Sequence, residues 1–181
     1  METERLRLRP LEAGDLDAWH RRIFSDPEVT RFLPVREPIP RERAAERLAR
    51  LVEGWRTRGF GVWALLESGS DQLVVGHCGF VTPEVPDRVE LIYALGRDWW
   101  GRGLATEAGA ASLRHGFNVL SFGEVVALAF PDNEPSIRVM LKLGFAFDGT
   151  TRRLGVELAR YGVTAASFRA SSHARVGAAG T

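Results

Sequence analysis

The chain has 181 residues, of which 45% are hydrophobic, and a formal net charge of +1. This length supports one domain with a substantial core, and the near balance of basic and acidic side chains argues against a nucleic-acid-binding protein, which usually carries a basic surplus. A single cysteine excludes an internal disulfide, and no apolar run is long enough to span a membrane, so we expect no membrane partner.

The first half of the chain predicts a strand, several helices and an antiparallel meander. We expect a strand at 3–9, helices at about 13–24, 26–33 and 40–57, and strands within 60–67, 72–82 and 87–95. The strands of the meander are separated by the turn-like pieces Ser68 to Asp71 and Pro83 to Asp87. Arginines between 41 and 58 are interleaved with glutamates at helical spacing, which favours a solvated helix face over a nucleic-acid surface.

The second half predicts alternating helices and strands. We expect a helix at 104–119, a strand at 123–130, a helix at 134–143, and a hairpin made of 145–154 and 156–168. The last residues, 170–181, are rich in Ala, Gly and Ser and should form a flexible C-terminal tail, which leaves 1–169 as a single domain. The charged N-terminus predicts no signal peptide, so a cytoplasmic protein is expected.

The run Trp100-Gly101-Arg102-Gly103-Leu104-Ala105-Thr106-Glu107-Ala108 is the first functional signal. Its glycines allow unusual backbone angles and close approach by a ligand, and the residues after them begin the predicted helix. A helix N-terminus favours negative charge, and Arg102 together with Arg97 could add positive charge. The pattern therefore predicts a pyrophosphate site, with an ordinary glycine-containing turn as the alternative.

Two better-known phosphate loops fit this run less well. A P-loop requires Gly-Lys-Ser/Thr, which Gly101 to Gly103 does not supply. The dinucleotide-binding fingerprint is closer, but Thr106 stands where close helix–strand packing asks for Gly or Ala. The predicted meander before the loop also differs from the βαβ unit of that fold.

A second signal spans Asn133 to Phe145, with the sequence NEPSIRVMLKLGF. Asn133 is a suitable N-cap, Pro135 suits the first helical turn, and Gly144 suits the helix end. By itself the segment predicts a capped amphipathic helix.

Together the two signals resemble the GNAT superfamily of acetyl-CoA-dependent N-acetyltransferases. Further motifs resemble its ribosomal-protein N-terminal acetyltransferase branch (RimJ/RimL-like): TERLxLRP at Thr3 to Pro10, Trp63-Ala64, and Val75 to Gly79. The resemblance implies an α/β (α+β) fold class: one GNAT-like domain with a mixed, mostly antiparallel twisted sheet flanked by helices. A splayed strand pair would form the acyl-CoA cleft.

The resemblance also implies the residues that bind the cofactor, acetyl-CoA. The backbone of Tyr93, Ala94 and Leu95 would lie beside the pantetheine arm, where main-chain donors could polarise the thioester carbonyl. The remaining contacts would come from Trp100, Gly101, Arg102, Gly103, Leu104, Ala105 and Thr106 around the pyrophosphate, and from Asn133 and Ser136 beside the pantetheine. No metal is expected, because the histidines lie far apart without metal-ligand spacing.

Glu90 is the candidate general base and Ser136 the candidate acid. Strict alternation would place Glu90 on the face opposite Leu95, so a bulge would be needed to bring both to one cleft; an outward-facing solvated Glu90 is the alternative. Many members of the family carry a tyrosine as the acid where this chain has Met140, which cannot donate a proton. In the ribosomal-protein branch the serine of Asn-x-x-Ser takes that role, although Ser136 could instead satisfy backbone groups of the first helical turn.

The expected activity is direct acetyl transfer to a primary amine, most simply a protein or peptide N-terminal α-amine. Small-molecule amines are one alternative, and a silent acyl-CoA-binding module is another. Aromatic residues could line the acceptor site or belong to the core: Trp19, Phe24, Phe32, Trp63 and Phe80. Cys78 is expected to be a buried strand residue rather than a covalent nucleophile, and the protein is expected to be a monomer or a homodimer.

Overall fold

The structure is a computed structural model that describes residues 1–181 except 70–72, 83–88, 154 and 179–181, and leaves the side chains from 172 onward undescribed. The turns predicted at Ser70 and Asp71 and at Pro83 to Asp87 lie outside the described residues. The chain divides into two compact units. The first unit comprises Met1–Val81 and Leu91–Ala111, and the second comprises Thr82–Glu90 and Ser112–Thr181.

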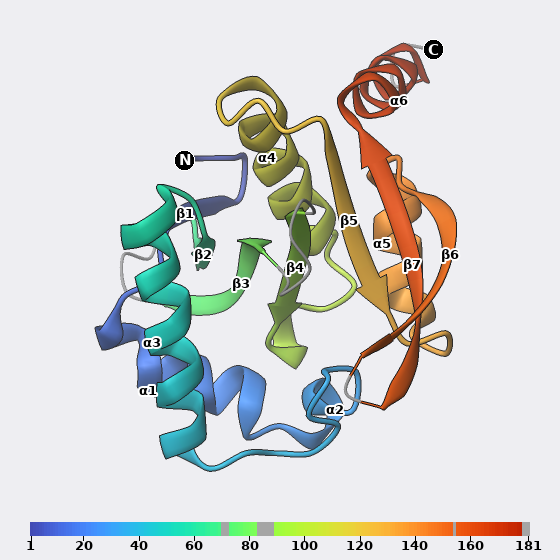
Figure 1. Cartoon of the computed structure of the whole chain (residues 1–181). Helices are drawn as coiled ribbons and strands as arrows, with labels where there is room; N and C mark the ends of the chain where they lie inside the picture. The colour runs from blue at the N-terminus through green and yellow to red at the C-terminus, as the bar shows by residue number, and fades with distance from the viewer. Residues whose placement is uncertain (70–72, 83–88, 154, 179–181) are drawn as a thin grey trace. The chain divides into compact units, whose positions relative to one another are not determined.

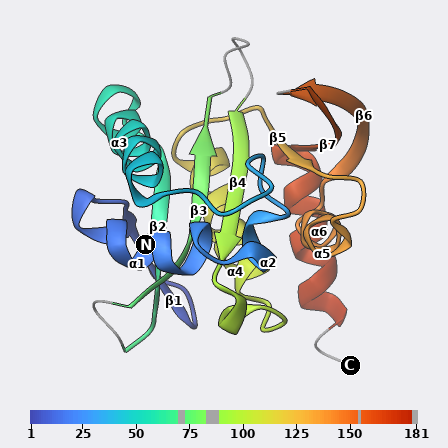
Figure 2. The ribbon, with the colours of Figure 1, turned by 90° about the horizontal axis from the view of Figure 1, so that it is seen from below.

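The first unit contains the antiparallel strands that the sequence predicts. Strand β1 (Leu6–Pro10) pairs with β2 (Val62–Glu67), and β2 pairs with β3 (Val74–Val81) across a register shift between Leu65 and Leu66. Strand β4 (Val89–Leu95) follows β3 in the sheet, and the two lie side by side in Figure 2.

The helices of the first unit begin with a continuous helical segment. It consists of η1 (Ala13–Asp15), α1 (Leu16–Trp19) and η2 (His20–Phe24), and is followed by α2 (Pro27–Thr30) and α3 (Arg41–Arg58). Helix α3 ends where Gly59 adopts a left-handed conformation with φ 73°. The short η3 (Arg97–Trp99) precedes α4 (Leu104–Asn118), of which the residues to Ala111 belong to this unit.

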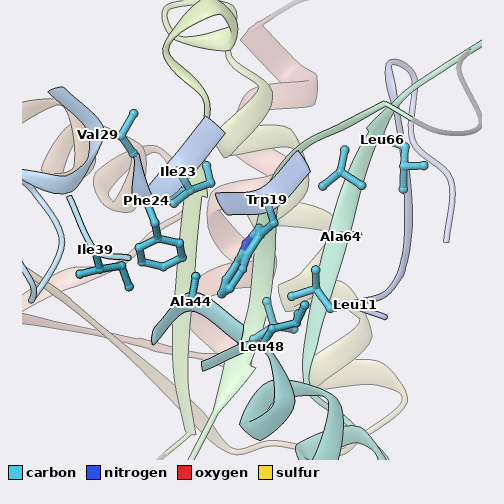
Figure 3. Packing of buried hydrophobic residues seen from close by; sticks show 13 residues of the cluster. Leu11, Trp19, Ile23, Phe24, Val29, Ile39, Ala44, Leu48, Ala64 and Leu66 are labelled. Atoms are coloured by element: carbon cyan, nitrogen blue, oxygen red, sulfur yellow. The ribbon is translucent and has the colours of Figure 1, made fainter. Parts of the chain in front are cut away.

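Apolar side chains of these helices pack on β2 and β3 to form the core of the first unit. Trp19 and Phe24 meet edge to face with ring centroids 4.7 Å apart, and Leu48 of α3 packs into the same cluster (Figure 3). Most arginines of α3 are exposed, and Arg56 pairs with Glu53 on this side, whereas Arg47 is half-buried and lies over the Phe24 ring. The solvated helix face predicted for 41–58 is therefore confirmed.

The described residues of the second unit form one parallel and two antiparallel strand pairings. The first residues of β4 pair in parallel with β5 (Glu124–Ala129), β5 pairs antiparallel with β7 (Val156–Thr164), and β7 pairs antiparallel with β6 (Ala146–Arg153). A register shift between Phe147 and Thr150 accompanies the curvature of β6 along β7 in Figure 1. The unit also contains α5 (Glu134–Lys142) and α6 (Ala165–Ala178).

The strand order β1-β2-β3-β4-β5-β7-β6 gives seven strands in a mixed sheet within the described residues, so the predicted α/β class with a mostly antiparallel sheet is confirmed.

The strand predicted at 156–168 is too long, since β7 ends at Thr164. Thr164 and Ser167 exchange side chain to backbone hydrogen bonds of 3.0 and 3.2 Å, which caps a new helix at Ala165. This helix, α6, also covers most of the segment expected to be a tail.

None of the helices in the described part of the chain combines the length and the apolar character needed to cross a bilayer.

Candidate functional site

The glycine-containing loop of the first unit joins η3 to α4. Gly101 and Gly103 have φ values of 71° and 78°, in the left-handed region that favours glycine. A Cβ added at Gly101 would meet nothing within 4 Å, and at Gly103 its nearest neighbour would be Arg5 Nη2 at 3.6 Å. The glycines are thus required by backbone conformation rather than by crowding. The loop from Trp100 to Gly103 is exposed, so its backbone is open to a ligand.

The loop leads directly into the N-terminus of α4. The amide of Glu107 donates to the Gly103 carbonyl at 3.0 Å and makes the first bond of the helical ladder. The amides of Leu104, Ala105 and Thr106 precede this bond and have no acceptor within the helix. These amides and the helix dipole together favour an anion at this end of α4.

The arginines expected to add positive charge to the loop are both paired. Arg102 Nη2 lies 2.6 Å from Glu67 Oε1, and Arg97 Nε lies 3.6 Å from Asp26 Oδ2. Hydrogen bonds from Arg102 and Trp99 lower the pKa of Glu67. Because both partners of the Arg102–Glu67 pair are partly exposed, water screens the pair and Arg102 can exchange Glu67 for a phosphate at small cost.

Trp100 connects the loop to the end of β4. Its indole Nε1 donates to the Leu95 carbonyl at 2.8 Å, while the residue stays 40% exposed. Ala94 and Leu95 are buried, and Tyr93 is half-buried. The structure therefore brings Trp100 and Leu95, two of the predicted cofactor residues, into direct contact.

Glu90 lies in the second unit, at the start of β4. Its side chain is 6% exposed, and its Oε2 accepts a hydrogen bond of 2.7 Å from Nη1 of Arg153, at the end of β6. Burial raises the pKa of Glu90, and the charge and hydrogen bond of Arg153 oppose this change without cancelling it. The alternative of an outward-facing, solvated Glu90 is wrong. Glu90 and its neighbour Leu91 are both buried, so side chains on both faces of β4 are shielded from solvent at this point.

Asn133 and Ser136 form the N-terminus of α5 in the second unit. Asn133 Oδ1 accepts a hydrogen bond of 3.2 Å from the Ser136 amide, so the predicted N-cap is confirmed. This bond uses the Ser136 backbone, and Asn133 is half-buried. The described hydrogen bonds therefore join two pairs of residues: Ser136 to Asn133, and Arg153 to Glu90.

Four of the five aromatic residues considered for an acceptor site belong to the core. Trp19, Phe24, Trp63 and Phe80 are at most 5% exposed, and only Phe32 is half-buried. The aromatic pattern therefore reflects packing. The structure also places no group of three or more His, Cys, Asp or Glu of the described residues where they could hold a metal ion.

Two partners of the candidate site were missed by sequence reasoning. Nothing in the sequence indicated a contact between Arg153 and Glu90, because Arg153 reaches Glu90 only through the pairing of β6 with β7. Arg5 stood within a recognised motif, but nothing in the sequence indicated that it contacts the glycine loop, where its Nη1 donates to the Arg102 carbonyl at 2.8 Å.

Comparison with known proteins identifies the family. The model of the acetyltransferase (GNAT) domain matches residues 5–146. The chain is similar to the uncharacterized N-acetyltransferase p20 of Bacillus licheniformis, with 32% identity over 152 residues, which cover 83% of this chain and 84% of the relative. A crystal structure of a putative acetyltransferase from T. thermophilus has 30% identity and a TM-score of 0.78, over 100% of this chain and 96% of that chain.

Two further similarities concern proteins with named acceptors. The ribosomal-protein-S5-alanine acetyltransferase of Vibrio fischeri shares the fold, with a TM-score of 0.73 at 16% identity over 91% of this chain and 95% of that chain. Spermidine N(1)-acetyltransferase of Escherichia coli K12 is 32% identical over 62 residues, which cover 34% of this chain and 33% of the relative. The chain belongs to the GNAT acetyltransferase family, and it is an acetyl-CoA-dependent acetyltransferase.

Proposed function

We propose that this acetyltransferase acts on the N-terminal α-amine of a protein or peptide. The observation that carries the proposal is the buried carboxylate of Glu90, which Arg153 holds at 2.7 Å. A carboxylate with a raised pKa takes a proton more readily than an exposed one, which is what a general base requires.

The cost of deprotonating the acceptor supports an α-amine. An α-amine with a pKa near 8 costs about 1–1.5 kcal/mol to deprotonate at pH 7, whereas a lysine side chain costs about 4–5 kcal/mol. Glu90 is the one carboxylate proposed for this task, and Arg153 opposes the rise in its pKa that burial causes. A base of this kind is better matched to the α-amine.

The cofactor would bind along the residues that the family resemblance assigns. The exposed backbone of Gly101 to Gly103 and the first amides of α4 would hold the pyrophosphate. The backbone of Tyr93 to Leu95 and the amide side chain of Asn133 would orient the pantetheine. Since Asn133 Oδ1 already caps α5, its NH₂ group is the part proposed to donate to the cofactor.

The proposed chemistry is direct transfer. The neutral amine attacks the thioester carbonyl carbon, Glu90 accepts the amine proton, and the C–S bond breaks. The departing thiolate then takes a proton from the Ser136 hydroxyl, and solvent restores the protonation of both side chains. A covalent acyl-cysteine is disfavoured because Cys78 is fully buried in β3, so Cys78→Ala should retain activity.

A polyamine acceptor is the second candidate. The partial match to a spermidine acetyltransferase favours it, although that match covers only a third of the chain. The third alternative from the sequence, a silent acyl-CoA-binding module, has little support from the relatives, since most of them are named acetyltransferases.

A thiol-release screen tests the acceptor. Acetyl-CoA is offered with peptides that have a free N-terminus, with N-terminally blocked lysine peptides, and with spermidine, and CoA release is measured. We expect release with the free α-amine peptides. Release with spermidine alone would favour the second candidate, and release with none of these amines would leave the α-amine proposal without support.

A further inference from the structure

The N-terminal segment of the chain holds the glycine loop through Arg5. Arg5 Nη1 donates to the carbonyl oxygen of Arg102 at 2.8 Å. Its Nη2 lies 3.6 Å from the position that a Cβ would take on Gly103. Both contacts lie within the first unit and link the residue before β1 to the loop before α4.

Arg5 is itself held by Glu107, in the first turn of α4. Oε2 of Glu107 accepts from Arg5 Nε at 2.7 Å and forms an ion pair with Arg5 Nη2 at 2.6 Å, and Oε1 accepts from the Arg5 amide at 2.8 Å. The Thr3 hydroxyl also donates to Oε1, at 2.6 Å. These hydrogen bonds lower the pKa of Glu107 although burial opposes them, which keeps the carboxylate charged. We call Thr3, Arg5 and Glu107 the loop clamp.

The loop clamp determines the direction of one amide of the loop. The carbonyl of Arg102 and the N–H of Gly103 belong to the same trans peptide group and point in opposite directions. When Arg5 holds the carbonyl on its own side, the Gly103 N–H must point away from Arg5. Glu107 also donates its own amide to the Gly103 carbonyl at 3.0 Å, so the next peptide group is fixed as well.

We infer that Arg5 is a positioning residue for acetyl-CoA, which orients the Gly103 amide toward the pyrophosphate before the cofactor arrives. Glu107 neutralises Arg5, so its contribution comes from preorganising the loop rather than from its charge. Arg5 acts through the loop backbone and takes no part in the chemistry. This inference rests on the proposed function, because it requires the loop to bind the pyrophosphate.

Arg5→Met tests the inference, since it removes the donors and keeps the length of the side chain. We expect the KM for acetyl-CoA to rise about tenfold while kcat stays within about twofold of wild type, because the loss falls on binding. With S-acetylpantetheine, a donor that has no pyrophosphate, kcat/KM should be unchanged. Thr3→Val, which removes one donor to Glu107, should give a smaller rise in the KM for acetyl-CoA and provides a second test if Arg5→Met does not fold.

The matched control is Arg9→Met. Arg9 lies on β1, and its guanidinium makes a bidentate pair with Asp15 at 2.6 and 2.8 Å, away from the loop clamp. Its loss should lower the thermal stability and leave the KM for acetyl-CoA unchanged. Two results would overturn the inference: an unchanged KM in both Arg5→Met and Thr3→Val, or an equal loss with S-acetylpantetheine. A wild-type protein that binds CoA and its pyrophosphate-free analogue equally well would instead overturn the proposed pyrophosphate site.

Discussion

Arg153 pairs with Glu90, whose side chain is far more buried than its own. The Glu90 side chain is 6% exposed and the Arg153 side chain 38%, and Arg153 Nη1 lies 2.7 Å from Glu90 Oε2. Burial raises the pKa of Glu90, and the partly solvated Arg153 limits the rise. The net rise in pKa increases the affinity of Glu90 for a proton, and Arg153 favours its charged form.

Arg153→Gln should move the acidic limb of the pH profile of kcat/KM to higher pH. Arg153 lowers the pKa of Glu90, so its removal raises that pKa further, and a general base works only when deprotonated. Activity should fall most at the acidic end of the profile and recover as the pH rises. Arg160→Gln, which removes a partly exposed ion pair with Asp148, is the control and should not shift the acidic limb of the profile. A shift to lower pH in Arg153→Gln would contradict the assignment of Glu90.

Ser136→Ala should reduce kcat while leaving the stability of the protein nearly unchanged. The bond that caps α5 uses the Ser136 backbone amide, which alanine retains. Loss of a general acid costs about 10²–10⁴ in rate. Asn133→Ala is the matched comparison, because it removes the cap and should cost about 1 kcal/mol in the free energy of unfolding. Full turnover in Ser136→Ala would remove the serine from the mechanism.

Gly103→Glu should weaken acetyl-CoA binding by more than about tenfold. The side chain would project from the exposed loop at φ 78°, strain the backbone, and place a carboxylate beside the proposed pyrophosphate site. Calorimetric titration measures the effect. Gly149→Glu, at φ 94° in β6 with nothing within 4 Å, introduces comparable strain elsewhere and should bind acetyl-CoA normally. Equal affinities in wild type and Gly103→Glu would exclude the loop as the pyrophosphate site.

His77 should make the protein less stable in mild acid. Its ring is buried in β3 and accepts a hydrogen bond of 3.0 Å from Trp19, and burial lowers its pKa from 6.5 to about 4. The unfolded chain therefore binds a proton that the folded protein does not, and stability falls as the pH drops from about 6.5 toward 4, by about 3 kcal/mol in total. Urea unfolding at pH 7 and pH 4.5 should show a smaller difference in His77→Gln than in wild type. The same difference in both proteins would contradict this role.

The local patterns of the sequence predicted most of the fold. The Asn133 cap, the glycines of the loop and the helix with interleaved arginines all depend on neighbouring residues, and all three features are confirmed. The end of β7 was placed too late, because the capping exchange between Thr164 and Ser167 outweighs the strand pattern.

The parts of the site that could not be predicted from the sequence are long-range contacts. Arg5 and Glu107 lie 102 residues apart, and Glu90 and Arg153 lie 63 apart, so neither pair leaves a periodic trace in the sequence. The burial of Glu90 could not be predicted either, since a lone glutamate in a strand is usually solvated. Its partner became evident only through the pairing of β6 with β7 and of β4 with β5.

The acceptor and the role of Glu90 can be tested in one measurement: kcat/KM for one peptide with a free and with a blocked N-terminus, in wild type and Glu90→Gln. Glu134→Gln, at an exposed pair with Arg138, is the control. We expect turnover only with the free N-terminus, and a loss of about 10²-fold or more in Glu90→Gln with unchanged acetyl-CoA affinity. Equal turnover of the two peptides, or full activity in Glu90→Gln, would contradict transfer to an α-amine with Glu90 as the base.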